Sequence, residues 1–157
     1  MYKVGQNIIH IRNGLSTIFD IVEMNERQYY IVRVNRGDGE NIYVPVLNAD
    51  SIIRPILSKE EADSLLKSLK EIKKEFNPNT KQRRDAFKKR LSSGKVEDIA
   101  YMYRLNCLYT ADPENVKLGA SDIDMLNYAK TMLLDELCLT YEVNMDEIEN
   151  LILTKIK

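Results

Sequence analysis

The sequence predicts an α+β fold in which a five-stranded antiparallel barrel of the Tudor or SH3 kind precedes an all-helical domain. Short β-branched and aromatic runs, separated by tight-turn signals, fill residues 4–55. Beyond residue 58, apolar residues recur at helical spacing instead. Because the pattern changes near Leu57, we expect a barrel over residues 1–57 and a helical domain over residues 58–157.

The N-terminal segment contains five candidate strands joined by short connections. Arg12-Asn13-Gly14 is a turn signal, and the glycine-rich stretch 35–39 is typical of a hairpin loop. Pro45 lacks a backbone donor, which favours an edge position for its strand. The predicted strands are Val4–Ile11, Leu15–Met24, Gln28–Val34, Asn41–Val46 and Ser51–Pro55.

Capping signals and helix breakers divide the C-terminal segment into helices. Ser58 and Glu61 form a predicted capping box, in which each side chain bonds to the backbone N–H of the other residue. The helical pattern that follows is broken at Asn77-Pro78, because proline removes a donor and restricts its predecessor. Ser121 is expected to cap a long helix, and Asn144 a final one.

The strongest functional signal is a basic cluster between residues 81 and 95. This stretch contains seven cationic residues and a single acidic residue, Asp85. Ala86, Phe87 and Leu91 recur among them at helical spacing, which predicts a helix with one apolar stripe and a broad basic face. Gly94 is expected to end this helix. The cationic residues are Lys81, Arg83, Arg84, Lys88, Lys89, Arg90 and Lys95.

This cluster is a local concentration of charge, because the whole chain has a formal net charge of only -1 at pH 7. Such patches attract polyanions, since binding releases condensed counterions. The alternative interpretation is a solvated helix face with no special role.

Composition and motifs exclude several classes of protein. No apolar run is long enough to span a membrane or to act as a signal peptide, so we expect a cytoplasmic location. Cys107 and Cys138 are too far apart for a zinc motif and are expected to be reduced. His10 is the single histidine, and no helix follows Gly37 and Gly39 to complete a phosphate-binding loop. We therefore predict a non-enzymatic protein without a metal or cofactor.

Several short pieces, none specific alone, follow one another in a recognisable order along nearly the whole chain. They are Val4-Gly5, Ile8-Ile9, Gly14, Val44-Pro45-Val46, Ile53-Arg54-Pro55-Ile56, Ser58-Lys59-Glu60-Glu61, Arg83, Leu91-Ser92-Ser93-Gly94, Ile99-Ala100 and Arg104. This order resembles the CarD family of bacterial transcription regulators, whose N-terminal module is shared with the transcription-repair coupling factor. The resemblance implies a protein that does no chemistry and stabilises the open promoter complex.

The resemblance also implies a partner for the N-terminal domain, namely the β subunit of RNA polymerase. Met24 and Tyr43 roughly align with two arginines of the strands with which the family grips polymerase. An edge strand can also pair with a partner strand through backbone bonds, which depends little on side-chain identity. The predicted polymerase-binding residues are Met24, Tyr43, Val44 and Pro45.

By the same resemblance, the helical domain touches promoter DNA at the upstream edge of the melted region. Arg83 and Arg104 match the family pattern and suit phosphate contacts. Cys107 stands at the position of the family's DNA-wedging tryptophan, for which Tyr103 or Tyr109 would have to substitute, since this chain has no tryptophan. The predicted DNA-binding residues are Arg83, Arg84, Lys88, Lys89, Arg90, Arg104, Cys107 and Tyr109.

A second function class is also compatible with these residues: a protein-interaction adaptor whose basic helices bind RNA or an acidic protein. A promoter-binding regulator needs polymerase for tight binding, prefers forked or melted DNA and depends steeply on salt. An adaptor shows no dependence on promoter structure. We favour the regulator, with mainly backbone contacts to DNA, and expect a monomer.

Overall fold

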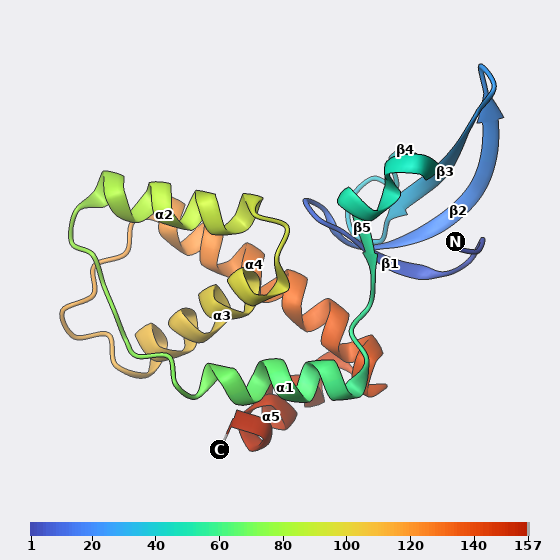
Figure 1. Cartoon of the computed structure of the whole chain (residues 1–157). Helices are drawn as coiled ribbons and strands as arrows, with labels where there is room; N and C mark the ends of the chain where they lie inside the picture. The colour runs from blue at the N-terminus through green and yellow to red at the C-terminus, as the bar shows by residue number, and fades with distance from the viewer. Residues whose placement is uncertain (157) are drawn as a thin grey trace. The chain divides into compact units, whose positions relative to one another are not determined.

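The computed structural model describes residues 1–156 and contains two compact units, Met1–Ile56 and Leu57–Lys157 (Figure 1). Within the described residues, the first unit is built on a five-stranded antiparallel sheet and the second on five helices. The predicted α+β class is therefore confirmed.

The five strands of the first unit form one sheet in the order β4-β3-β2-β1-β5. Pro45 lies on an edge strand, as predicted, and the 3-10 turn η1 (Val46–Ser51) separates that strand from the other edge. Because the two edge strands do not pair with each other, the predicted barrel is not closed. The strands are β1 (Asn7–His10), β2 (Gly14–Met24), β3 (Arg27–Val34), β4 (Asn41–Pro45) and β5 (Ile53–Pro55).

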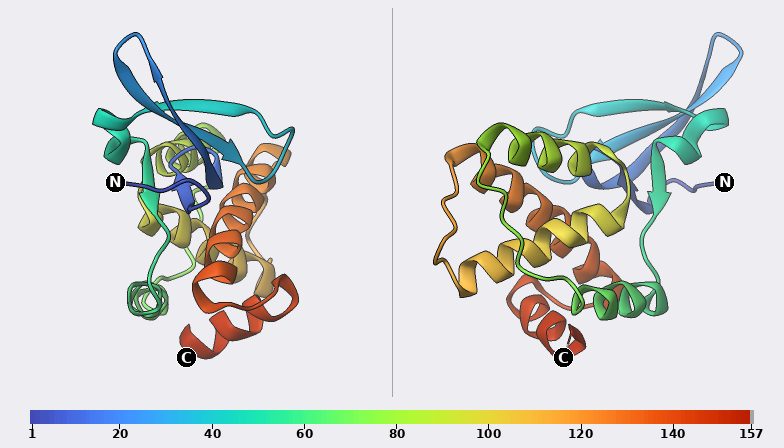
Figure 2. Two further views of the ribbon diagram at one scale, coloured as in Figure 1. Left: turned by 90° about the vertical axis from the view of Figure 1, so that its right-hand side faces the viewer. Right: turned by 60° about the vertical axis from the view of Figure 1, so that its left-hand side comes forward.

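The hairpin of β2 and β3 extends beyond the neighbouring strand, as the views in Figure 2 show. Asn25 and Glu26 at its tip have positive φ angles of 51° and 65°, which are typical of a two-residue turn that matches strand twist. β4 pairs with β3 only between Tyr29 and Arg33. The tip of the hairpin is therefore supported only by its own two strands.

The inner face of the sheet buries an apolar core. Its largest member, Tyr30, accepts a hydrogen bond from the Tyr2 backbone N–H at 3.0 Å, and the two rings meet edge to face at 5.6 Å. Burial of each large apolar side chain contributes about 1.5–3 kcal/mol. The buried residues of this core are Ile8, Ile18, Tyr30, Val32, Val44, Ala49 and Ile53.

The longest helix, α4, organises the second unit. It packs against α2, α3 and α5, while α1 packs mainly against α5 and α3 (Figure 1). Leu66, Met102, Leu126 and Leu133 are among the fully buried side chains between these helices. The helices are α1 (Lys59–Leu69), α2 (Thr80–Ser92), α3 (Val96–Ala111), α4 (Ala120–Tyr141) and α5 (Met145–Ile156).

Capping contacts explain where several of these helices begin. The predicted Ser58–Glu61 capping box is present, with reciprocal N–O distances of 3.0 and 3.1 Å. Asn144 accepts a hydrogen bond from the Glu147 N–H at the start of α5, as predicted. These contacts satisfy backbone donors that the first turn of a helix leaves free.

The predicted cap of α4 is wrong by two residues. Ser121 lies inside the helix, and Gly119 occupies the N-cap position. The reason is Asp122, whose carboxylate accepts a hydrogen bond from the Gly119 backbone N–H at 2.9 Å. A carboxylate in the first turn also suits the positive end of the helix dipole.

Leu57, the first residue of the helical unit, is bonded to α4 through both of its backbone groups. Its N–H donates to the Glu136 carboxylate at 2.8 Å, and its carbonyl accepts from the Thr140 hydroxyl at 2.9 Å. Glu136 and Thr140 are both buried and lie one turn apart. These bonds fix the chain where the helical unit begins.

Candidate functional site

The outer side of α2 presents exposed lysines to the solvent. None of its exposed lysines makes an ion pair in the part of the chain that the structure describes. Arg84 and Arg90 are half-buried beside them. The exposed cations of α2 and the residues after it are Lys81, Lys88, Lys89 and Lys95.

The inner side of α2 differs from the predicted apolar stripe. Phe87 is buried and Leu91 is half-buried, as expected, but Ala86 is exposed. Arg83 lies one turn before Phe87 on the same side of the helix and is buried with it. The buried side of α2 therefore contains an arginine, Arg83, next to the core residue Phe87.

Arg83 is held inside the unit instead of on its surface, so its expected surface position is wrong. The side chain is 5% exposed, and its Nη2 lies 2.7 Å from Oδ2 of the fully buried Asp122. Its Nη1 donates to the Asn77 carbonyl at 2.9 Å, and its guanidinium lies over the Phe76 ring at 4.8 Å. Arg83 thus joins the segment before α2 to the first turn of α4.

The charge of Asp122 is maintained by these contacts. Burial acts to raise its pKa, but the hydrogen bonds from Arg83 and Gly119 outweigh burial, so the pKa is lowered. Arg84 lies close by, with its Nη2 3.1 Å from the position that a Cβ on Gly119 would occupy. The glycine thereby leaves room for a second guanidinium at the start of α4.

Arg90 links α2 to α3 while remaining partly accessible. Its Nη1 bonds to Asp98 at 2.7 Å, and its guanidinium lies 3.7 Å above the centre of the Tyr101 ring. Such a stacked cation is attracted by the negative face of the ring.

The tyrosines predicted to replace a wedge are buried in α3. Tyr109 donates its hydroxyl hydrogen to the Glu75 carbonyl, and burial, followed by the neighbouring Tyr101, raises its pKa to about 12. Burial also raises the pKa of Tyr103, which lies beside Cys107. Neither ring is exposed, so their burial is at odds with the expected insertion into DNA.

Cys107 lies apart from the cations of α2. Both Cys107 and Arg104 are half-buried. Cys107 lines a pocket of about 330 Å³ together with Lys130 on α4 and Leu153 on α5. Since the residues of α3 that face α2 lie on another side of the helix, the structure does not bring Cys107 and the basic helix to one surface.

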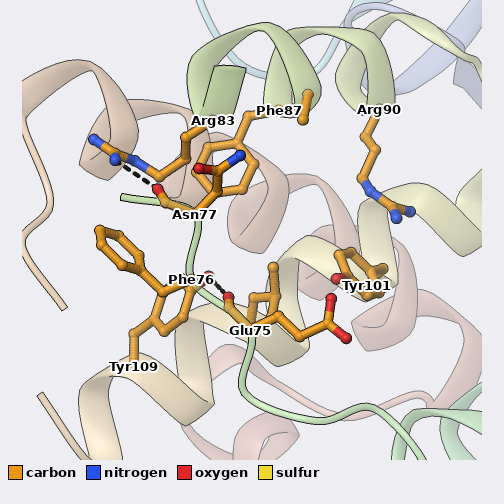
Figure 3. A pocket seen from close by; sticks show the side chains of 10 residues that line it. Glu75, Phe76, Asn77, Arg83, Phe87, Arg90, Tyr101 and Tyr109 are labelled. Carbon is orange, nitrogen blue, oxygen red and sulfur yellow. Dashed lines mark hydrogen bonds between the residues drawn. The ribbon is translucent and has the colours of Figure 1, made fainter. Parts of the chain in front are cut away.

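A different pocket, of about 340 Å³, lies between α2, α3 and the segment before α2 (Figure 3). Figure 3 shows Arg90 directed toward Tyr101, and Arg83 on the opposite side near Asn77. The sequence analysis did not identify this pocket, because its walls come from three separate segments. Its aromatic and arginine side chains are Phe76, Phe87, Tyr101, Tyr109, Arg83 and Arg90.

In the first unit, the predicted polymerase-binding residues lie at the edge of the sheet and the end of the hairpin. Tyr43 is 50% exposed on the edge strand β4, and Met24 is 40% exposed at the end of β2. The Val44 side chain is fully buried and Pro45 is half-buried. Val44 therefore presents no accessible surface to a partner.

Phe19 is an exposed aromatic residue that the sequence analysis did not single out. It lies at an irregularity in the β2–β3 register between Ile18 and Asp20, and the Arg33 guanidinium covers its ring at 3.6 Å. A bulge of this kind redirects a side chain without any residue signature.

Residues 1–156 contain no group of three or more histidine, cysteine or acidic side chains that could hold a metal ion. In the same range, no helix has the length and apolar character needed to cross a membrane.

Two family models match the chain, one for each structural unit. Residues 2–57 match the CarD-like/TRCF RID domain. Residues 64–153, more than half of the chain, match the C-terminal domain of CarD.

Proposed function

Since the chain belongs to the CarD family of RNA polymerase-binding regulators, we propose that its sheet unit binds the β subunit while its helical unit contacts promoter DNA and stabilises the open complex. Proteins of this family are non-enzymatic regulators. The matches to the two family domains support the part of this proposal that concerns binding to RNA polymerase.

The exposed lysines of α2 support the proposed contact with promoter DNA. Lys88 and Lys89 make no ion pair among residues 1–156, so a DNA phosphate can pair with them and release its counterions. Arg84 and Arg90 on α2 and Arg104 on α3 are half-buried and can each add a phosphate contact. Arg83 supports this surface indirectly, by holding α2 against α4.

The edge strand β4 supports the polymerase contact. Its exposed Tyr43 and its free edge offer a partner strand both side-chain and backbone contacts. We expect Met24→Asp/Tyr43→Asp to lower the amount of RNA polymerase that coprecipitates with the full-length protein about tenfold. Ile123→Asp, a charge added at an exposed site on α4, is the control. Equal retention by all variants would refute a contact of polymerase with the Met24 and Tyr43 side chains.

The DNA contact is tested with Lys88→Gln/Lys89→Gln and a charge-matched control on α1, Lys59→Gln/Lys67→Gln. The α2 variant is expected to shorten the lifetime of open complexes under heparin challenge. The slope of log affinity against log salt should fall by about one for each phosphate contact removed. An identical loss in the α1 variant would mean that only net charge matters. Binding that ignores promoter melting would favour the adaptor function.

A further inference from the structure

The pocket beneath α2 has the lining of a site for a flat heteroaromatic ring. We propose that it receives an unpaired DNA base from the melted strand while the phosphates of that strand lie on α2. This inference rests on the proposed DNA contact of α2.

The walls of the pocket favour a planar ligand. Its volume of about 340 Å³ lies within the range of about 300–1,000 Å³ typical of small-molecule sites. Phe76, Phe87 and Tyr101 contribute aromatic surface, and Arg90 adds a planar guanidinium already stacked on Tyr101 (Figure 3). A base can stack on such surfaces whatever its identity, because every base has a π face.

The polar groups of the pocket favour a neutral ring over a phosphate. The Tyr101 hydroxyl and the Glu75 carboxylate have no hydrogen-bond or ion-pair partner among residues 1–156. Together with the remaining N–H groups of Arg90, they offer both donors and an acceptor, which the edge of a base requires. A phosphate would be repelled by Glu75 and would find Arg83 already paired with Asp122.

The opening of the pocket adjoins the lysines of α2. Ala86 lines the pocket and is exposed, so it lies at the rim. Lys89 follows three residues later and is therefore its neighbour on the helix surface. A phosphate held by Lys89 would bring the adjacent base to this opening.

A base inside a duplex cannot enter the pocket without unstacking, which costs a few kcal/mol, whereas a base in a melted strand avoids that cost. The lysines of α2 attract DNA through its phosphates, whatever its base sequence. The pocket would add to this attraction a preference for melted DNA over duplex DNA.

The test measures binding of the full-length protein to a fluorescent single strand of about 12 nucleotides, to the same strand with abasic sites, and to the duplex. Tyr101→Leu removes the stacking ring, and Ala86→Phe fills the opening from an exposed position; Ala86→Ser is the size control. Thermal melting checks that each variant is folded.

We expect Tyr101→Leu and Ala86→Phe to weaken single-strand binding about tenfold and to change duplex binding less than about twofold. Wild-type protein should bind the abasic strand as weakly as the variants bind the intact strand. Equal affinity of the wild type for the abasic and intact strands would overturn the proposal, as would equal losses on single strand and duplex.

Two further arms separate this inference from the proposed function. If Lys89→Gln leaves both DNA forms unaffected while Tyr101→Leu weakens the single strand, the pocket stands and the phosphate contact of Lys89 fails. If Lys89→Gln weakens both forms while Tyr101→Leu changes neither, only the pocket fails. Displacement of the strand by free dAMP at concentrations near the Kd of the strand would assign the pocket to free nucleotides and overturn the DNA proposal.

Discussion

Arg83 and Asp122 form an ion pair that the helical unit has enclosed in its interior. Taking both charges out of water is costly, and the hydrogen bonds from Arg83 to Asn77 and from Gly119 to Asp122 offset part of that cost. Arg83 Nε and Asp122 Oδ1 remain without a partner in the described residues. Loss of either ion would leave its partner buried and uncompensated.

We therefore expect Arg83→Met to lower the free energy of unfolding by about 3–5 kcal/mol in urea titrations. Arg84→Met is the matched control, because Arg84 is half-buried and makes no ion pair within residues 1–156. The double variant Arg83→Met/Asp122→Leu should recover part of the loss, since it removes both charges. An equal loss in the Arg83 and Arg84 single variants would contradict this account.

His10 holds the turn between β1 and β2 in its neutral form. It is 6% exposed, and its Nδ1 accepts hydrogen bonds from the backbone N–H groups of Arg12 and Asn13 at 3.2 and 3.3 Å. Burial, and then the positive charge of Arg12, lower the pKa of His10. The folded sheet unit thus resists protonation of this ring.

The free energy of unfolding should consequently fall as the pH drops below about 6.5. In this range His10 becomes protonated in the unfolded chain but stays neutral in the folded protein, because its pKa is lowered there. Above that pH the contribution is constant. His10→Gln keeps an acceptor without titrating, so its melting temperature should depend less on pH between 5 and 6.5. The pKa values of Asp63 and Asp122 are lowered, which keeps their titration outside this window. Parallel curves for both proteins would contradict the assignment.

The apolar residues Phe87 and Leu91 and two ion pairs hold the helix α2 to the rest of its unit. Phe87 packs in the core, while Arg83 and Arg90 bond to α4 and α3 respectively. Its first turn is stabilised by Asn79, whose side chain accepts from the Gln82 N–H at 2.9 Å. The N-terminal end of α2 therefore depends on a cap as well as on packing.

Asn79→Ala should cost about 0.5–2 kcal/mol of stability and speed hydrogen exchange of the first amides of α2. Asn127→Ala, at an exposed position inside α4, is the control and should be neutral or stabilising because alanine favours helices. Faster exchange throughout the helical unit, instead of at this end, would indicate global destabilisation and not loss of a cap.

The connection between the two units is short. Pro55 still pairs with Ile8 in the sheet, and Leu57 is already bonded to α4. Only Ile56 lies between them. In the proposed function, in which one unit binds polymerase and the other binds DNA, this connection holds both partners together.

Insertion of two glycines after Ile56 should leave binding to polymerase unchanged, because neither set of backbone bonds is altered. The lifetime of the open complex should fall, since a longer connection holds the second surface less effectively near its target. Insertion of two glycines in the loop at Asp38, between β3 and β4, serves as the control. An unchanged lifetime would show that the two units act independently.

Much of this architecture is local in origin and therefore followed from the sequence. The α+β class, the strands of the first unit, the Ser58 capping box and the edge position of Pro45 arise from residues near one another in the chain. The family likeness, spread over many short pieces, is confirmed by matches to both domains.

The sequence alone thus determined the elements, the family and the position of the basic helix. Tertiary packing decided which side of that helix is covered, because α4 supplies Asp122 as the partner that draws Arg83 inward and leaves the lysines outside. Packing also left the sheet open and formed the pocket from three segments. The physical reason is that periodicity shows which residues share a face, whereas burial depends on contacts between residues far apart in the chain.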